Sequence, residues 1–551
     1  MSFPHAQSRS SPPGRSRRLG GLVAAIVVTA QLAACGGSSG PPKPAVLPPV
    51  YPDRSGPLAS FTPGNGELGS TGDPAAKLDL LRQLGVRNIH IGIQWAVIAP
   101  DPQSRQRPVF NASDPAAYPA AGWTMYDKIA QDMAARGMVL TLALIPPAPI
   151  WATGTGNANR QEQAYWRPSP SEFEQFARAV GTRYSGHYTP PGASSPLPRL
   201  DHWSVWNEPN EGFQLAPQLV PHTQIESSGR QYRALLDAAW AALHQTGHGG
   251  DSILIGETAP IGSSLGSLPG LFGPMIPLRF LRALYCVDAA YMPLRGTAAA
   301  QRGCPTTAAG TAGFAAAHPA LFQASGFANH PYPQGLAPNT VTPQEPDYTE
   351  LAATGRLEST LDHLNTIYGS HTRYRIYSTE FGYQTNPPDT ENGVVSPQTA
   401  AAWLNWAEYI TWLDPRQVSF DQYLISDPPN GVFASGLITA GGTTKPAYDA
   451  YRMPLFLPVT ATTRGHPLVV WGDVRPAYYV QRQTHRAQRV QIEFARQRSA
   501  SFQTVQTVPI LSSHGFFETR VTFPGSGTVR LVWHYPNGGR IVSRAVVVTL
   551  R

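Results

Sequence analysis

Residues 203–210 read WSVWNEPN, and residues 377–383 read YSTEFGY. In each stretch a glutamate, Glu208 or Glu380, directly follows an apolar run that is typical of a buried strand. When parallel strands close into a barrel, their carboxyl ends meet at one mouth. The two stretches therefore predict two carboxylates that project into a shared cleft.

Apolar runs and helical segments alternate on both sides of these stretches. Proline or serine opens several of the helices and glycine closes them, as at Gly85 and Gly137. Eight such strand and helix units predict an α/β fold, a (β/α)8 barrel with long insertions over residues 56–455. We expect its strands at residues 58–61, 88–94, 138–145, 202–206, 253–256, 326–329, 375–379 and 418–425.

The pattern changes after Pro454. Short runs of alternating apolar and polar residues follow, separated by turn sequences such as the PNGG of residues 536–539. This spacing predicts a small antiparallel β-sandwich over residues 456–551. Packing against the barrel is the simpler role for such a domain, and sugar binding is the alternative.

The first 34 residues have the features of an export signal. An arginine-rich start precedes an apolar core at residues 19–30, which is too short for a permanent transmembrane helix. The sequence LAAC that ends at Cys35 resembles a bacterial lipobox. We expect a protein that is lipid-anchored through Cys35 on the outer face of the cell membrane, or secreted if the signal is an ordinary one. Residues 35–55, rich in Gly, Ser and Pro, are expected to form a tether.

Two further cysteines, Cys286 and Cys304, flank a Gly/Ala-rich insertion. In an exported protein they can form a disulfide, and two unpaired thiols are the alternative. The formal net charge of +7 falls to about +3 when the four arginines of the first 34 residues are removed (7 − 4 = 3). This balance does not favour nucleic-acid binding. No metal-binding or phosphate-binding motif is apparent, so we expect no cofactor, and we expect a monomer.

Together, the sequences Asn207-Glu208-Pro209 and Thr379-Glu380-Phe381-Gly382 resemble motifs of the large clan of retaining (β/α)8 glycoside hydrolases. The clan includes the cellulase-like family 5 and the xylosidase-like family 39. The resemblance implies a glycosidase that cleaves a β-linked oligo- or polysaccharide by double displacement, with Glu208 as acid/base and Glu380 as nucleophile. A carbohydrate-binding lipoprotein that keeps the barrel without turnover is the alternative.

The same resemblance implies roles for residues around the two glutamates. Asn207 would bind the sugar hydroxyl next to the anomeric carbon, Tyr332 would donate a hydrogen bond to Glu380, and His330 would line the subsite wall. Two strand-end tryptophans, Trp95 and Trp151, could stack on sugar rings, with core packing as the alternative.

Other positions depart from the clan or remain open. His90 and Gln94 stand on the second strand, where the clan often has an arginine, and strand eight lacks the usual tryptophan. Glu257, at the end of strand five, could touch substrate, and a structural salt bridge or cap is the alternative. Residues 262–266 match the Gly-x-Ser-x-Gly pattern of serine esterases around Ser264, but no helix is expected after it.

Overall fold

The computed structural model describes residues 49–64, 67–68, 74–156, 159–264 and 267–551. Cys35 and the predicted export signal lie outside these residues. The described residues form one unit by their internal contacts. Among the described residues, no helix combines the length and the apolar character needed to cross a bilayer.

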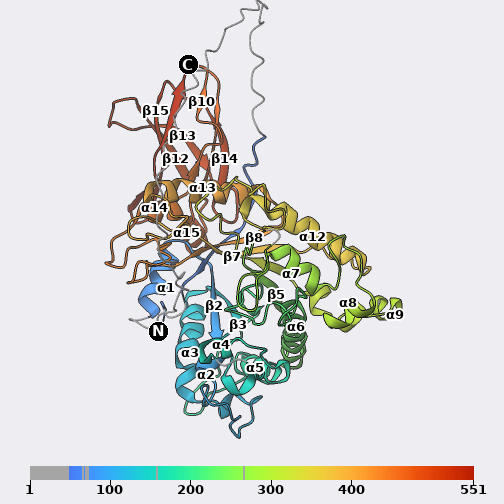
Figure 1. Cartoon of the computed structure of the whole chain (residues 1–551). Helices are drawn as coiled ribbons and strands as arrows, with labels where there is room; N and C mark the ends of the chain where they lie inside the picture. Colours follow the sequence, from blue (N-terminus) through green and yellow to red (C-terminus); the bar gives the residue numbers. More distant parts are fainter. Residues whose placement is uncertain (1–48, 65–66, 69–73, 157–158, 265–266) are drawn as a thin grey trace, which may run out of the picture. The chain divides into compact units, whose positions relative to one another are not determined.

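Eight parallel strands close into a barrel in sequence order, and β1 pairs with β8. This confirms the predicted (β/α)8 fold, because each expected strand is present. Figure 1 shows barrel strands with helices around them. The strands are β1 (Leu58–Thr62), β2 (Asn88–Gln94), β3 (Val139–Ile145), β4 (His202–Val205), β5 (Ser252–Thr258), β6 (Gly326–Asn329), β7 (Arg375–Phe381) and β8 (Gln417–Tyr423).

Helices surround the barrel and bury their apolar faces against it. Local signals fix their ends: Ser169 and Ser396 cap the first turns of α5 and α13, and Gly137 ends α3 in the left-handed conformation. The main helices are α1 (Pro74–Gln83), α3 (Ala120–Arg136), α5 (Pro170–Arg183), α6 (Ser228–Gln245), α7 (Pro277–Leu284), α12 (Thr354–Ile367), α13 (Pro397–Leu413) and α14 (Pro446–Arg452). Short helices in the loops are α2 (Trp95–Ile98), α4 (Arg160–Gln163), α8 (Gly296–Gln301), α9 (Ala308–Ala312), α10 (Phe314–Ala317) and α11 (Ala320–Gln323).

The loop after β5 contains the predicted disulfide, since Cys286 and Cys304 are bonded to each other. Both cysteines are buried in the same apolar cluster as the barrel helices. The disulfide therefore ties the inserted helices to the outer layer of the barrel.

The C-terminal residues form two β-sheets over a separate apolar core, as predicted. Most neighbouring strands are antiparallel, but β10 joins β17 in parallel. Four elements were not predicted: the two-residue strands β9 and β10, strand β13, and helix α15, which begins after Pro476. The elements are β9 (Leu455–Phe456), β10 (Ala461–Thr462), β11 (Leu468–Asp473), α15 (Ala477–Thr484), β12 (Arg489–Arg496), β13 (Gln503–Pro509), β14 (Phe516–Val521), β15 (Gly527–His534), β16 (Arg540–Val542) and β17 (Val546–Leu550).

An aromatic cluster joins the C-terminal sheets to helix α13. Trp471 and Phe516 pack against Tyr409 and Trp412 of that helix, and all four side chains are buried. The N-terminal segment contributes as well, because Tyr51 packs on this cluster and its N–H donates to Glu518 Oε2 at 2.7 Å. The predicted tether thus extends too far along the chain: from Tyr51 onward the segment is part of the fold.

A buried arginine makes a second contact between the two domains. Arg475 forms an ion pair with Glu408 of α13, and each side chain is 1% exposed. Its backbone packs against Gly85, where an added Cβ would lie 2.4 Å from the Arg475 carbonyl carbon. Packing against the barrel is therefore a role that the structure shows for the C-terminal domain.

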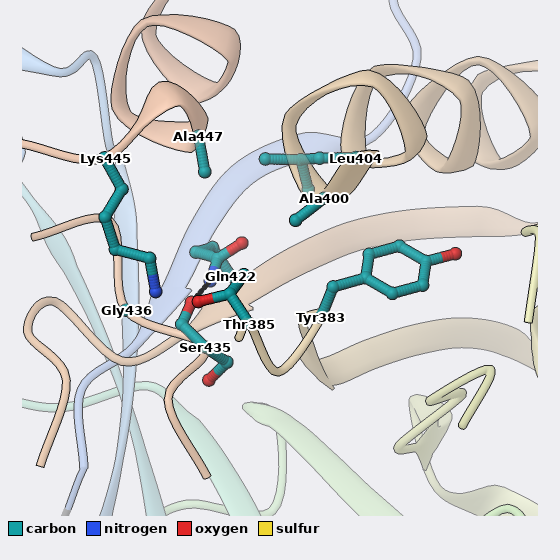
Figure 2. Close-up of a pocket in the computed structure, with 9 residues that line it drawn as sticks. All are labelled: Tyr383, Thr385, Ala400, Leu404, Gln422, Ser435, Gly436, Lys445 and Ala447. Atoms are coloured by element: carbon teal, nitrogen blue, oxygen red, sulfur yellow. Dashed lines mark hydrogen bonds between the residues drawn. The ribbon is translucent and has the colours of Figure 1, made fainter. Parts of the chain in front are cut away.

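The loop after β8 is held by a buried ion pair. Lys445 Nζ donates to Asp427 Oδ1 at 2.8 Å and to the Ala434 carbonyl at 2.9 Å. Figure 2 shows Lys445 beside a small pocket, where Gln422 donates to the Ser435 carbonyl at 2.8 Å. The pocket has a volume of about 10 Å³, close to the space that one water molecule needs. It is therefore too small for a sugar. Its lining consists of Tyr383, Thr385, Ala400, Leu404, Gln422, Ser435, Gly436, Lys445 and Ala447.

Candidate active site

Glu208 lies just beyond the end of β4 in an unusual backbone conformation. Its φ is +40°, and that of Trp206 two residues earlier is +73°, a region that residues other than glycine rarely adopt. The Glu208 N–H donates to the Glu257 carbonyl at 2.8 Å, and the Glu208 carbonyl accepts from the Glu211 N–H at 2.8 Å. These backbone bonds hold the chain in a turn at the barrel mouth, and such strained positions are common at functional sites.

Glu380 lies near the end of β7, with its side chain 15% exposed. The Tyr332 hydroxyl donates to Glu380 Oε2 at 2.9 Å. The Tyr332 ring packs edge-on against Phe433, which comes from the loop after β8. The structure thus places Tyr332 where the family resemblance implies a hydrogen-bond donor to the nucleophile.

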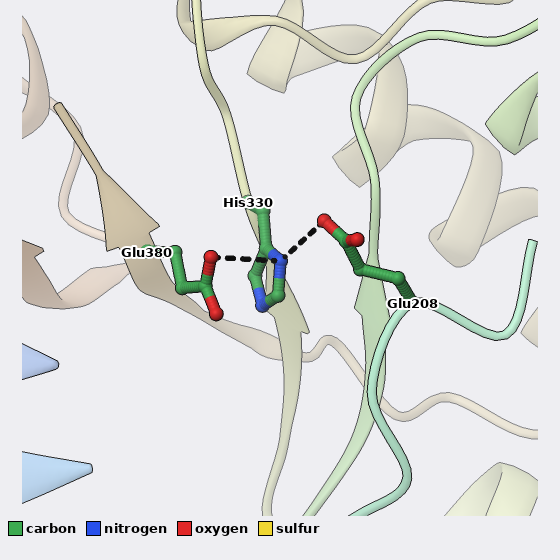
Figure 3. Close-up of side chains that lie close together, drawn as sticks. All are labelled: Glu208, His330 and Glu380. Atoms are coloured by element: carbon green, nitrogen blue, oxygen red, sulfur yellow. Dashed lines mark hydrogen bonds and ion pairs between the residues drawn. The ribbon is translucent and has the colours of Figure 1, made fainter. Parts of the chain in front are cut away.

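The side chain of His330 lies between the two glutamates (Figure 3). Its Nδ1 is 2.9 Å from Glu208 Oε1 and 3.6 Å from Glu380 Oε2. The two carboxylates offer oxygens within 4.8 Å of each other. Because His330 is completely buried, it is not a surface of the subsite wall as expected, but a bridge between the two carboxylates.

Glu257 lies beneath this pair and is also completely buried. Its Oε2 accepts from Thr379 Oγ1 at 2.6 Å and lies 2.9 Å from His330 Nε2. Ser204 Oγ donates to its Oε1, and His90 Nε2 lies 3.2 Å from the same oxygen. Of the two roles left open for Glu257, the structure supports the buried ion pair.

The buried carboxylates and histidines of this cluster stabilise each other's charged forms. Burial lowers the pKa of His330, but the charge of Glu380 and the hydrogen bonds to Glu208 and Glu257 outweigh it, so the pKa lies well above its ordinary value. Burial raises the pKa of Glu257, yet the charge of His90 and the hydrogen bond to His330 hold that pKa below its usual range. Glu257 is therefore ionised and His330 is an imidazolium near neutral pH.

Burial raises the pKa of Glu380 above its ordinary value. The charge of His330 and the hydrogen bond from Tyr332 oppose that increase, whereas the charge of Glu208 adds to it. The site therefore contains a carboxylate whose ionisation depends on the charge of His330 and on the hydrogen bond from Tyr332.

Among the described residues, Glu208, His330 and Glu380 bring possible metal-ligating atoms within 4.8 Å of one another. A metal ligand must offer a lone pair, and an imidazolium has none. Both ring nitrogens of His330 already face carboxylate oxygens. The cluster is therefore arranged for proton exchange, and a metal ion would have to displace the ring protons of His330.

No family model and no curated protein matches the sequence. Solved structures with a similar fold include a glucosidase from Croceicoccus marinus, which is 11% identical over 90% of this chain and 98% of that one, with a TM-score of 0.46. A calcium-binding mutant of Bacteroides uniformis beta-glucuronidase 2 is 10% identical over 90% of this chain, with a TM-score of 0.41. The chain spans only 45% of that glucuronidase. The beta-glycosidase of Thermosphaera aggregans is 14% identical over 73% of this chain and 96% of that one, with a TM-score of 0.41.

The two tryptophans predicted as sugar platforms are buried in the core. Trp95 is 0% exposed, and its ring stacks on Phe176 of α5. Trp151 is 9% exposed, packs edge-on against Trp95, and donates its indole N–H to the Pro100 carbonyl. The structure thus places both rings in core packing, the alternative role. A strand-end position suggested that Trp95 faces the barrel mouth, but Trp95 begins the short helix α2, which turns its ring into the core.

The remaining candidates have less defined positions. Asn207 is half-buried directly before Glu208. Ser264 is exposed, in a motif whose last two residues lie outside the described part of the chain. Phe433 was not predicted, because only the folded loop after β8 brings it onto Tyr332.

Proposed function

We propose that the protein is a retaining glycoside hydrolase that cleaves a β-linked oligo- or polysaccharide, with Glu380 as nucleophile and Glu208 as acid/base. The observation that carries the proposal is the pairing of these glutamates: they come from the ends of β7 and β4, and their oxygens lie within 4.8 Å of each other. Carboxyl groups of retaining enzymes stand roughly 5 to 5.5 Å apart, whereas those of inverting enzymes leave roughly 6.5 to 9.5 Å for a water molecule.

The surroundings support separate roles for the two carboxylates. Glu380 must be ionised to attack the anomeric carbon, and the Tyr332 hydroxyl and the His330 imidazolium both stabilise its charge. Glu208, 23% exposed, is the more accessible of the two and can reach a leaving-group oxygen.

The reaction then follows two balanced steps. In the first, Glu380 forms an ester bond with the anomeric carbon while the glycosidic bond breaks, and the proton of Glu208 passes to the leaving oxygen. In the second, Glu208 takes a proton from water, and the resulting hydroxide displaces Glu380. Both glutamates return to their starting states.

Substitution of the glutamates tests these roles. Glu380→Ala should lower kcat on an aryl β-glycoside by about 10⁴-fold or more, and added azide should restore turnover by occupying the place of the lost carboxylate. Glu211 is the matched control: it lies three residues after Glu208, is half-buried, and has a pKa raised by burial and by the charge of Glu208. If Glu211→Ala lowers activity as much as Glu208→Ala, the assignment of the acid is wrong.

Two other functions give different outcomes in the same experiment. If the protein only binds carbohydrate, the natural chain hydrolyses no glycoside. Glu380→Ala is then equally inactive, and azide restores no turnover. A serine esterase would lose activity in Ser264→Ala and keep it in Glu380→Ala.

We also propose that the protein is exported and held at the outer face of the bacterial membrane by a lipid on Cys35. The LAAC sequence at residues 32–35 supports this proposal. Metabolic labelling with a radioactive fatty acid should mark the natural chain and not Cys35→Ser. A soluble, unlabelled natural chain would favour secretion.

A further inference from the structure

Glu257 is the centre of the buried cluster beneath the two glutamates. Its side chain contacts four residues on separate strands or strand ends: His90 on β2, Ser204 on β4, His330 after β6 and Thr379 on β7. Its carbonyl also accepts the N–H of Glu208. Glu257 has a φ of +49°, so the chain adopts an unfavourable backbone conformation at the point where these contacts converge.

The hydrogen bonds around His330 determine where its protons lie. An ionised carboxylate can only accept hydrogen bonds. Nε2 of His330 lies 2.9 Å from Glu257 Oε2, so Nε2 must carry a proton toward an ionised Glu257. Nδ1 lies 2.9 Å from Glu208 Oε1 and 3.6 Å from Glu380 Oε2. Burial lowers the pKa of His330, but the surrounding carboxylates raise that pKa well above its ordinary value, so Nδ1 also carries a proton and donates to Glu208 Oε1. Two donated bonds from one ring require an imidazolium.

This arrangement also distinguishes the two oxygens of Glu208. Oε1 accepts from His330, so the acid proton of Glu208 must sit on Oε2. When that proton passes to the leaving oxygen, Glu208 becomes a carboxylate, and the bond from His330 to Oε1 becomes a bond between opposite charges. The hydrogen bond from His330 to Glu208 Oε1 therefore strengthens as Glu208 transfers its proton to the leaving oxygen.

We propose that Glu257 is a positioning residue that keeps His330 doubly protonated, so that His330 fixes Glu208 Oε1 and stabilises the carboxylate formed when Glu208 gives up its proton. The effect on catalysis rests on the proposed function; the protonation of His330 does not. Other charged groups face this cluster as well: His90 from β2, Glu380 from β7 and Asp421 from β8. His90 offsets part of the negative charge of Glu257, and the rest of that charge stabilises the imidazolium of His330.

Nuclear magnetic resonance of the full chain with ¹⁵N-labelled histidine tests the inference without a substrate. The chain has 15 histidines, so His330 is assigned by the signal that disappears in His330→Gln. We expect both ring nitrogens of His330 to be protonated at pH 8 in the natural chain. In Glu257→Gln the ring should lose a proton at clearly lower pH, because the buried negative charge is gone.

Ser204→Ala is the matched control, since it removes one hydrogen bond to Glu257 but leaves the charge and the contact with His330 in place. Its His330 should titrate as in the natural chain. A neutral His330 at pH 8 in the natural chain would overturn the inference, and this outcome is decisive even if Glu257→Gln does not fold. Equal titration in Glu257→Gln and in Ser204→Ala would overturn it too.

Kinetics separate this inference from the proposed function. Glu257→Gln should lower kcat/KM at least about tenfold on a glycoside with a poor leaving group, which needs the acid, and should have little effect on kcat/KM for a dinitrophenyl glycoside, because kcat/KM reports the first step. KM should change little in both cases. If the natural chain hydrolyses no glycoside, the proposed function fails while the resonance result stands. If the natural chain is active but the loss in Glu257→Gln does not depend on the leaving group, the inference fails alone.

Discussion

The hydrogen bond between Tyr332 and Glu380 offers a quantitative test of the site. Tyr332→Phe removes the hydroxyl that lies 2.9 Å from Glu380 Oε2. The ring itself should stay in place, because it packs edge-on against Phe433 and is 7% exposed. A hydrogen bond to a charged group contributes about 1.5 to 3 kcal/mol. Because the nucleophile loses this bond, we expect kcat/KM to fall by about 10- to 150-fold.

The same substitution should change the pH profile in a defined direction. The Tyr332 hydroxyl lowers the pKa of Glu380, against the effect of burial. Without the hydroxyl, Glu380 takes up its proton at higher pH, and a protonated carboxyl cannot attack. The acidic limb of kcat/KM should therefore move to higher pH in Tyr332→Phe.

Steady-state hydrolysis of an aryl β-glycoside between pH 4 and pH 9 measures both effects. Tyr383→Phe is the matched control, because Tyr383 lies three residues after Glu380 but its hydroxyl donates to the Leu336 carbonyl. If Tyr332→Phe and Tyr383→Phe have equal effects, or if the acidic limb moves to lower pH, the reasoning is refuted.

Three further predictions concern stability. Burial raises the pKa of Asp421 to about 7, whereas an unfolded aspartate has a pKa of about 3.9. As the pH rises between these two values, the unfolded state ionises first and the fold loses stability. Asp421→Asn should therefore raise Tm more at pH 8 than at pH 5. An equal gain at both pH values would contradict this. Replacing Cys286 and Cys304 by alanine should lower the free energy of unfolding by about 3 kcal/mol, because their bond closes a loop between residues 18 positions apart. Urea unfolding with and without reductant measures this difference. If reductant does not change the stability of the natural chain, the prediction is refuted. Arg475→Met leaves buried Glu408 without its partner and should cost about 3 to 5 kcal/mol, whereas adding Glu408→Leu should recover much of the loss; a double variant as unstable as the single one would argue against the ion pair.

The barrel could be predicted because each of its strands is a separate apolar run between turn residues. The strand ends were harder to place where polar side chains continue the strand, as at Glu257 and Thr258 of β5. Strand β13 was missed because its sequence QTVQTVP is mostly polar and most of it is exposed or half-buried. Helix α15 was missed because it interrupts a segment with the alternation of a β domain.

The site could be predicted only in part. Glu208, Glu380 and Tyr332 belong to short motifs, so their positions at strand ends follow from the chain itself. The contacts of His330 and Glu257 depend on how the closed barrel brings β5 and β6 beside β4 and β7. No local pattern contains that information. Burial of Trp95 is likewise a tertiary property, since it depends on Phe176 from α5.

The most direct test of the account is covalent trapping of the nucleophile. The full chain is incubated with a panel of activated 2-fluoro β-glycosides, which form the glycosyl ester but hydrolyse slowly, and the labelled peptide is then mapped. We predict one sugar per chain attached to Glu380, and the sugar that reacts identifies the substrate class. A label on any other residue, or no label from any sugar despite measurable hydrolysis of the parent glycosides, would contradict the account.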